Sequence, residues 1–231
     1  MTADAQKKQA AYAALDLIED GMTVGLGTGS TAAYFVRGLA EAGRDVKGVP
    51  TSEATAELAR ACGVELADID EATVIDVTVD GADEADRTFR LIKGGGGALL
   101  REKIVAAASR RMAVIADASK LKAELGAFPL PVEVTPYAFA LTVAAVRRTF
   151  ETHGFTDADI AMRMGEGGPF LSDGGNYIFD CALGRIGSPE ALADDLLHIP
   201  GVVETGLFID LATDLFIAAP DGVEHFQKPT A

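Results

Sequence analysis

The residues best suited to chemistry gather in three short segments: a glycine- and hydroxyl-rich stretch at 25–31, an acidic stretch at 80–84 and a glycine run at 93–97. Each segment lies where an apolar stretch gives way to a loop or helix. In an open α/β sheet, such strand ends meet at one edge, where ligands bind. Together the segments offer an anion-binding loop, clustered carboxylates, a cation and a helix-borne glutamate. This combination suits proton transfer on a small phosphorylated molecule.

The first segment reads GLGTGST and is predicted to turn from a strand into a helix. Glycines allow a ligand close to the backbone, while Thr28, Ser30, Thr31 and the free N–H groups of the helix can bind a phosphate. A dinucleotide site is disfavoured, because Ser30 replaces the third glycine of that motif and no acid closes the second strand. No Gly-Lys-Ser/Thr follows, so the loop is not a Walker loop. A tight turn without a ligand stays an alternative for this segment alone.

The acidic segment places Asp80, Asp83 and Glu84 within one turn after a buried strand. Crowded carboxylates repel one another, so at least one pKa should rise, which would suit acid–base catalysis on hydroxyl groups. Two alternatives stay open: a solvated turn, or a divalent metal site that would need further oxygen ligands.

The third segment contains four consecutive glycines, 94–97, which are costly to order. They lie between an apolar pair and a strongly helical stretch, a position that does not suit a loose linker. Lys93 could stabilise a developing oxyanion. Glu102, early in the next helix and among apolar neighbours, could have its pKa raised into the range of a general base. The alternative for Glu102 is a surface salt bridge with Arg101 or Lys103.

The elements that must position these segments alternate between strand and helix. We predict helices over 4–20, 31–39, 53–61 (with Ser52 as N-cap) and 97–109, and strands over 22–26, 46–49, 74–79 and 111–116. This alternation indicates a parallel sheet with right-handed crossovers. Lys120 follows the last of these strands at the same predicted edge, where it is either a further site cation or an ordinary exposed lysine.

The pattern changes after residue 130. Strands over 132–134, 160–162, 177–179 and 202–205 and helices over 137–152 and 189–197 give a βαββαβ order. We therefore expect an α/β protein with a Rossmann-like parallel sheet domain, 1–130 plus 206–231, and a smaller ferredoxin-like α+β domain, 131–205, involved in oligomerisation. The apolar tail, 206–219, is expected to return strands to the first sheet.

The overall charge limits the possible partners. A formal net charge of −15 over 231 residues argues against nucleic acids and anionic membranes, so any phosphate must be held by local cations and backbone amides. The sequence has no apolar run typical of a signal peptide or a membrane span. Two distant cysteines and three scattered histidines suggest no metal site, and the protein is expected to be cytoplasmic.

The chain resembles type A ribose-5-phosphate isomerases along its whole length. The resemblance rests on segments that occur in order and at the separations of that family: GLGTGSTA, the Thr51-Ser52 turn, VDGADE, IKGGGGALLREKI, IADASK, FPLPVEV and IPGVVETGLF. It implies conversion of D-ribose 5-phosphate into D-ribulose 5-phosphate in the pentose phosphate pathway, with no cofactor and no metal. It also implies a homodimer or homotetramer.

The resemblance further implies a role for individual residues. Glu102 would move a proton between C1 and C2 through an enediolate, while Asp80, Asp83 and Lys93 would handle ring opening and hydroxyl protons, with Lys93 also stabilising the oxyanion. The residues implied to bind substrate are Thr28, Gly29, Ser30, Thr31, Gly81, Ala82, Gly94, Gly95, Gly96 and Lys120.

Two other classes of protein are weighed against this interpretation. A sugar-phosphate-sensing regulatory domain could share the fold, but it would need no Glu102 and would usually bring a basic DNA-binding segment that is not seen here. A coenzyme A transferase would use a glutamate as nucleophile on a related sheet. Turnover of ribose 5-phosphate, compared with acyl transfer, separates these possibilities.

Overall fold

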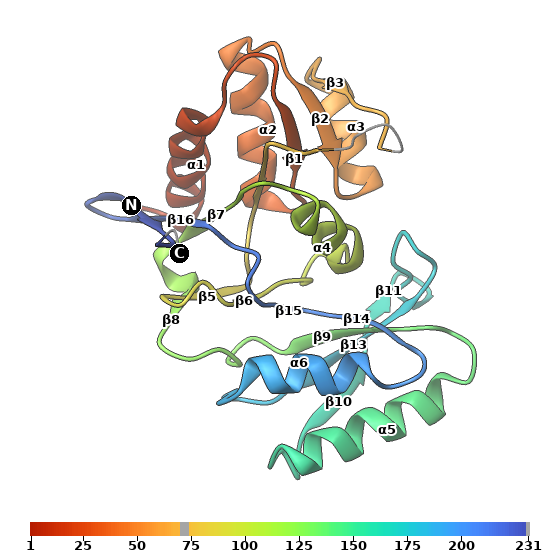
Figure 1. Ribbon diagram of the computed structural model, residues 1–231. Coiled ribbons are helices and arrows are strands. Elements are labelled where there is room, and N and C mark those ends of the chain that lie inside the picture. Colours follow the sequence, from red (N-terminus) through yellow and green to blue (C-terminus); the bar gives the residue numbers. More distant parts are fainter. Residues whose placement is uncertain (70–73, 230–231) are drawn as a thin grey trace.

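The computed structural model describes residues 1–69 and 74–229, and its largest element is a seven-stranded sheet (Figure 1). In chain order, the strands are β1 (Thr23–Leu26), β2 (Lys47–Pro50), β3 (Glu65–Leu66), β4 (Val77–Asp80), β7 (Met112–Asp117), β16 (Asp214–Ala219) and β17 (Gly222–Gln227). Their spatial order is β17-β16-β7-β4-β1-β2-β3, and neighbours are parallel except for the edge pair β16 and β17. The predicted parallel sheet is confirmed.

Helices cover both faces of this sheet, as a parallel sheet requires. They are α1 (Ala3–Ala13) with the 3-10 turn η1 (Ala14–Leu17), α2 (Ser30–Ala42), α3 (Glu53–Ala61) and α4 (Leu99–Ala107). Phe35 and Leu39 of α2 pack with Ile115 of β7 on one face. The next residue towards the N-terminus of that strand, Val114, packs with Leu99 of α4 in a different cluster, because successive strand residues face opposite sides.

A second, antiparallel sheet has the order β10-β13-β9-β14. Its elements follow the chain as β9 (Leu130–Val134), α5 (Phe139–Thr152), β10 (Asp159–Met162), β13 (Tyr177–Ala182), α6 (Pro189–Leu197) and β14 (Val202–Thr205). The two helices pack on one face through Phe150 and Leu192 against Val132. This is the βαββαβ arrangement that the sequence predicts, and the expected combination of a Rossmann-like sheet and a smaller ferredoxin-like unit is confirmed.

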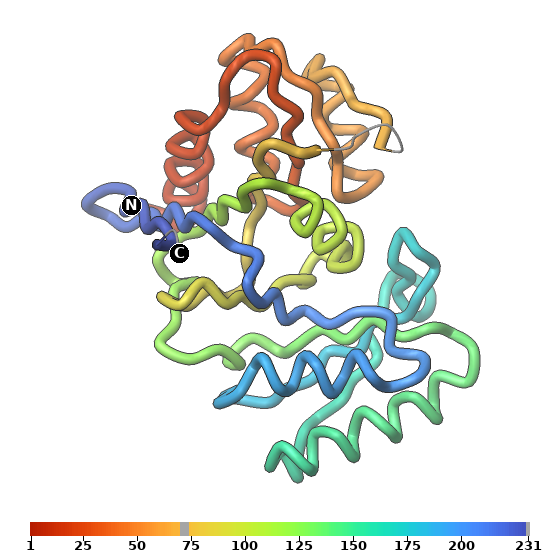
Figure 2. Tube along the Cα trace, in the orientation of Figure 1, coloured from red at the N-terminus to blue at the C-terminus, as the bar shows by residue number. Residues whose placement is uncertain are grey.

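A small third sheet lies between the other two, with the order β15-β6-β5-β8. Its strands are β5 (Glu84–Asp86), β6 (Leu91–Ile92), β8 (Leu121–Lys122) and β15 (Leu207–Phe208); the turn η2 (Ala118–Lys120) precedes β8, and the hairpin of β11 (Met164–Gly165) and β12 (Gly168–Pro169) extends from the second sheet. The chain trace passes from the large sheet to the second sheet and returns, so that β17 lies beside α1 (Figure 2).

Two element predictions need correction, and several strands, among them β17, are not predicted. The predicted helix over 4–20 is shorter, because α1 ends at Ala13 and a 3-10 turn follows. The strand predicted from residue 74 begins only at Val77. The sequence does not predict β17, a mostly exposed edge strand with few apolar residues.

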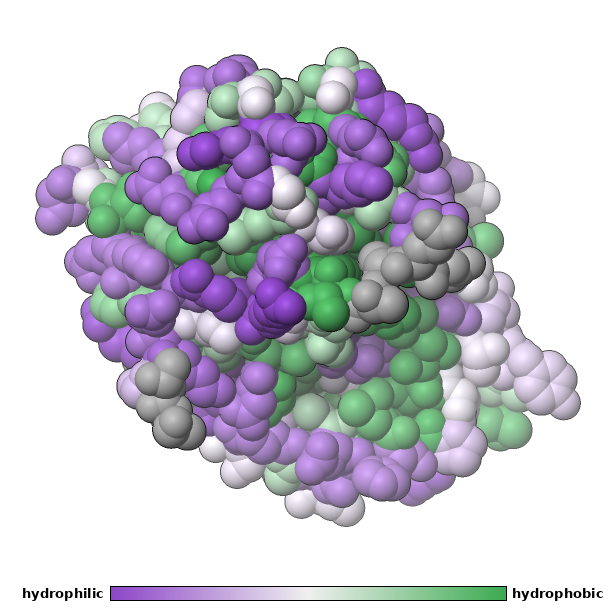
Figure 3. Space-filling model, turned by 45° about the horizontal axis from the view of Figure 1, so that its top comes forward, coloured by the Kyte–Doolittle hydropathy of each residue, from purple (hydrophilic) through white to green (hydrophobic). Residues whose placement is uncertain are grey.

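The surface in Figure 3 is mainly hydrophilic over its upper part, with an apolar area below it. In the described residues, we find no helix with the length and apolar character needed to span a membrane.

Candidate active site

The site forms where the order of the strands reverses. After β1, the chain goes to β2 on one side, whereas β4 lies on the other side of β1. Loops at the carboxyl ends of two strands that diverge in this way leave a crevice, which is where open α/β sheets bind ligands. The loop after β1 carries the GLGTGST segment, and β4 ends at Asp80. Two of the predicted segments are therefore adjacent for a topological reason.

A cavity of about 290 Å³ opens at this crevice. Its lining residues are Lys7, Thr28, Gly29, Ser30, Thr31, Gly81, Ala82, Asp83, Lys93, Gly94, Gly95, Gly96, Glu102 and Lys120. The cavity thus brings together every residue that the family resemblance implied for substrate binding, and three of the four implied for catalysis. The fourth, Asp80, is fully buried and contacts Lys93.

Asp80 is fixed by the glycine loop beside it. Its Oδ1 atom accepts hydrogen bonds from the backbone N–H of Thr28 at 3.1 Å and of Gly81 at 2.7 Å. A Cβ at Gly27 would lie 2.1 Å from that same oxygen, so only glycine lets the loop come this close. The pKa of Asp80 is raised, because burial disfavours the charge and Lys93 only partly opposes it. Burial, rather than the predicted crowding of carboxylates, is the leading cause.

Lys93 stands between two buried carboxylates. Its Nζ atom lies 2.9 Å from Asp80 Oδ2 and 3.4 Å from Glu102 Oε1, and it donates a hydrogen bond to the Gly81 carbonyl at 2.7 Å. Burial alone would lower the pKa of Lys93, but Asp80 and Glu102 outweigh it and raise that pKa. The ammonium therefore stays charged and is available to a negatively charged oxygen in the cavity.

Glu102 lies in the first turn of α4 and is 4 % exposed. Burial raises its pKa to about 8, with Lys93 opposing and Asp80 adding to the shift. Oε2 is buried, and no described residue forms a hydrogen bond with it. The alternative of a surface salt bridge is wrong, since Arg101 pairs with Glu53 and Lys103 pairs with Glu204. A carboxyl group with one free oxygen in a polar cavity is well placed to exchange a proton with a ligand.

Asp83 is held by the glycine run. The N–H of Gly95 donates to Asp83 Oδ2 at 2.7 Å, and a Cβ at Gly95 would lie 2.5 Å from Asp83 Oδ1. Glu84 does not join the site, although the acidic motif includes it. It begins β5 and accepts hydrogen bonds from the N–H groups of Gly126 and Phe128 at 2.7 and 2.8 Å. Because successive residues of a strand point to opposite sides, one carboxylate faces the cavity and the next is structural.

The end of the cavity near α2 suits an anion. Ser30 and Thr31 begin α2, so unpaired N–H groups and the positive end of the helix dipole face this region. Two lysines line it, Lys7 from α1 and Lys120 from η2, and Lys7 Nζ lies 3.1 Å from Ser30 Oγ. Lys7 is absent from the residues predicted for the site, because nothing in the pattern of α1 shows which of its exposed side chains reaches another helix.

Thr28 contributes differently from the prediction. Its Oγ1 atom lies 2.7 Å from Thr51 Oγ1 and 2.8 Å from Ser52 Oγ, in a cluster of hydroxyls that also includes Thr55. Ser52 also acts as the predicted N-cap of α3, accepting from the N–H of Thr55 at 3.1 Å. The Thr28 hydroxyl therefore anchors the loop to the Thr51-Ser52 turn, while its residue still lines the cavity.

Among the described residues, no group of three or more His, Cys, Asp or Glu side chains is arranged to hold a metal ion. The cavity instead combines a cation end, a buried lysine and carboxyl groups in more than one environment. Such a set can bind a phosphorylated molecule at one end and move protons at the other.

Comparison with known proteins agrees with this chemistry. Residues 47–222 match the family described as Ribose 5-phosphate isomerase A (phosphoriboisomerase A). The chain is 53% identical to the ribose-5-phosphate isomerase A of Parvibaculum lavamentivorans, covering 98% of this chain and 100% of the relative. It is also 53% identical to that of Agrobacterium fabrum, with 98% and 99% covered.

Solved structures give the same result at the level of the backbone. A D-ribose-5-phosphate isomerase in complex with phospho-erythronic acid superposes with a TM-score of 0.90 at 39% identity, covering 99% of this chain and 100% of that chain. The ribose 5-phosphate isomerase of Plasmodium falciparum superposes with a TM-score of 0.92 at 33% identity, with 98% and 100% covered.

Proposed function

The chain belongs to the ribose 5-phosphate isomerase A family, and on this premise we propose that it interconverts D-ribose 5-phosphate and D-ribulose 5-phosphate through an enediolate. The observation that carries the proposal is Glu102: a buried carboxyl with a free oxygen, next to a buried lysine, in a cavity whose other end suits a phosphate. An aldose–ketose isomerisation requires one base and one cation close together, and Lys93 Nζ lies 3.4 Å from Glu102 Oε1.

Binding begins at the phosphate. Ser30, Thr31, Lys7 and Lys120 hold it, and their local charge overcomes the net charge of −15 of the whole chain. This contact directs the sugar carbons towards Lys93 and Glu102. The phospho-erythronic acid bound by the related isomerase is a phosphorylated sugar acid, which supports a ligand of this type.

Ring opening precedes the isomerisation. Asp83, which Gly95 holds at the cavity wall, takes the proton of the hydroxyl group on the anomeric carbon and passes it to the ring oxygen as the bond between these two ring atoms breaks. Asp80 takes no direct part, because it lies outside the cavity lining. It acts through Lys93, which it holds at 2.9 Å.

The proton then moves between carbons. The ionised form of Glu102, a minor fraction at pH 7 because the pKa is about 8, removes the C2 proton of the open-chain aldose. The electrons shift to O1, which becomes the oxyanion of an enediolate. Lys93 stabilises that charge. Glu102 returns the proton to C1, while Lys93 gives a proton to O1 and takes the hydroxyl proton of O2 as the ketone forms, so that Lys93 ends in the state in which it began. Side chains supply each of these steps, so the reaction as written uses no cofactor or metal.

Self-association completes the proposal. We place the self-association surface on residues 131–205, where Tyr137 and Leu141 are 87% and 74% exposed, and we expect a homodimer or homotetramer. We place the enzyme in the cytoplasm, where free Cys62 and Cys181 stay reduced. Light scattering on the purified protein measures the assembly directly.

The test of the proposed reaction is turnover. The purified protein should convert ribose 5-phosphate to ribulose 5-phosphate, and it should not transfer an acyl group from a coenzyme A thioester. Acyl transfer without isomerisation would replace the proposal with the transferase alternative.

A further inference from the structure

Arg163 reaches from the second sheet to the glycine run of the active site. It lies just after β10 and its side chain is only 15% exposed. Its Nη1 atom donates to the carbonyl oxygens of Gly94 at 2.8 Å and Gly95 at 3.2 Å. Its Nε atom donates to Asp180 Oδ2 at 2.9 Å, and Nη2 donates to the other oxygen of that carboxylate. One guanidinium thus joins an acid of the second sheet to two peptides that line the cavity.

Because of the geometry of the peptide bond, this contact also fixes the direction of the N–H groups that face the cavity. In a trans peptide, the carbonyl and the following N–H point in opposite directions, and no cis peptide is present in the described residues. The peptide whose carbonyl Arg163 binds at Gly94 therefore directs the Gly95 N–H the other way. That N–H donates to Asp83 at 2.7 Å, so Arg163 and Asp83 hold the two ends of one peptide group.

The same geometry applies to the next peptide, which joins Gly95 to Gly96. Arg163 holds the Gly95 carbonyl, which turns the Gly96 N–H away from the second sheet. No described residue accepts a hydrogen bond from this N–H, and Gly96 lines the cavity. The N–H is thus available to an oxygen of a bound ligand.

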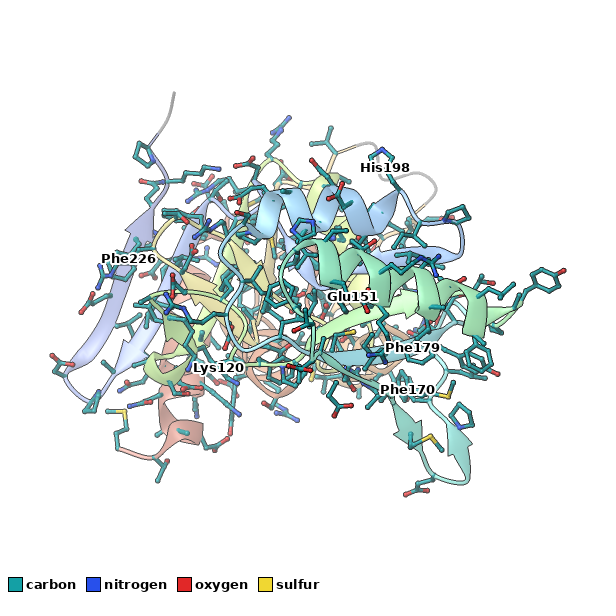
Figure 4. The ribbon with its side chains drawn as sticks, turned by 90° about the horizontal axis from the view of Figure 1, so that it is seen from below. Lys120, Glu151, Phe170, Phe179, His198 and Phe226 are labelled. Carbon is teal, nitrogen blue, oxygen red and sulfur yellow. The ribbon has the colours of Figure 1, made fainter. Side chains whose placement is uncertain are left out.

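The backbone of Arg163 and the neighbouring Phe170 are also held in place. The backbone of Arg163 donates to Ile178 and accepts from Phe170, which fixes the position of its Cα atom. Phe170 packs against the end of the same loop, where a Cβ at Gly97 would lie 2.4 Å from its ring. In Figure 4, Phe170 lies at the base of the β11–β12 hairpin, well away from Lys120 at the cation end of the cavity. Arg163 therefore acts on the part of the cavity that is far from the proposed phosphate-binding end.

We propose that Arg163 is a positioning residue, through which the second sheet fixes the glycine loop so that Gly95 orients Asp83 and Gly96 offers its N–H to the sugar. This inference rests on the proposed function. It assigns part of the catalytic geometry to a unit that contributes no catalytic side chain. Four glycines cannot hold such a geometry by themselves, because their backbone is the most flexible of any residue.

The test compares Arg163→Ala with Arg147→Ala, which removes another arginine of the same unit that donates to a carbonyl, that of Ala158, away from the loop. We expect Arg163→Ala to lower kcat/KM about 10- to 100-fold, since small displacements of reacting groups are costly. The variant should also bind phospho-erythronic acid about 10-fold more weakly. Inhibition by inorganic phosphate should change less than about twofold, because the cation end does not touch Arg163. Arg147→Ala should change none of these values.

Added guanidinium ion should restore part of the activity of Arg163→Ala. It should not raise the activity of Arg147→Ala. If Arg163→Ala does not fold, Arg163→Lys and Asp180→Asn replace it, each with an expected loss of about 3- to 10-fold, because an ammonium cannot bind Asp180 and two carbonyls in the same fork. Wild-type kcat/KM in these variants, or equal losses of phosphate and sugar-acid binding, would overturn the inference. A wild-type protein inactive on ribose 5-phosphate would instead refute the proposed function, and the two binding measurements could still be made.

Discussion

Replacing Glu102 with glutamine should remove nearly all activity and at the same time stabilise the protein. The carboxyl is buried, and its pKa rises from an ordinary value of 4.5 to about 8. In the folded protein at pH 7, Glu102 therefore keeps a proton that it would lose in the unfolded chain. Retaining that proton lowers the free energy of unfolding by about 3 kcal/mol, at roughly 1.4 kcal/mol for each pH unit between the ordinary pKa and pH 7. Glutamine has nearly the same shape and no such cost.

The sign of the effect depends on pH. A carboxyl whose pKa is raised by folding destabilises the folded state progressively as the pH rises from 4.5 towards 8. The advantage of Glu102→Gln should therefore vanish near pH 4.5 and reach about 3 kcal/mol at pH 7, which corresponds to a melting temperature about 6 to 12 °C higher for a chain of this size. Isomerisation should fall about 10²- to 10⁴-fold, the usual contribution of a general base.

The assay is chemical denaturation at pH 4.5 and pH 7, combined with turnover of ribose 5-phosphate. Glu53→Gln serves as the control, because the Glu53 side chain is 67% exposed and pairs with Arg101 on the surface. It should change stability by less than about 1 kcal/mol. If Glu102→Gln is no more stable than the wild type at pH 7, Lys93 keeps Glu102 ionised in the folded protein and the reasoning from burial is refuted.

Three further predictions follow from the same geometry. Lys93→Met should lower kcat about 10²- to 10³-fold and raise KM much less, because its ammonium acts mainly on the enediolate; a change in KM alone would reduce Lys93 to a ligand contact. Lys7→Ala should raise KM about 10- to 100-fold with little change in kcat, as expected when a charged hydrogen bond is lost, whereas Lys8→Ala, outside the cavity lining, should not. Treatment with a chelator should leave the rate unchanged, and a loss that added divalent ion restores would favour a metal site at the acidic segment.

The sequence predicts the local parts of this site well. A glycine loop, a strand that ends in carboxylates and a capped helix at Glu53–Ala61 depend on residues close together in the chain, and all are present. The parallel arrangement of the main sheet then follows from the alternation of strands and helices, whereas the antiparallel edge strand β17 does not. Because parallel strands end at one edge, the segments that follow them are expected to share a cavity, and they do.

The parts that the sequence does not predict depend on long-range contacts. Glu84 belongs to the acidic motif, but the register of β5 directs it to the 126–128 loop. Lys7 meets Ser30 only because α1 packs beside α2. Arg163 is 69 residues from Gly94, and no local pattern marks it as part of an active site.

The most direct test of the proposed chemistry is deuterium exchange at carbon. Ribose 5-phosphate is incubated in D₂O with the wild type or with Glu102→Gln, and label at C1 of ribulose 5-phosphate is followed by NMR. We expect the proton carried by Glu102 to exchange with solvent while the enediolate is bound, so the wild type should place deuterium on C1, and the variant should do so at least about 10²-fold more slowly. Labelling by Glu102→Gln at the wild-type rate would show that another group removes the proton.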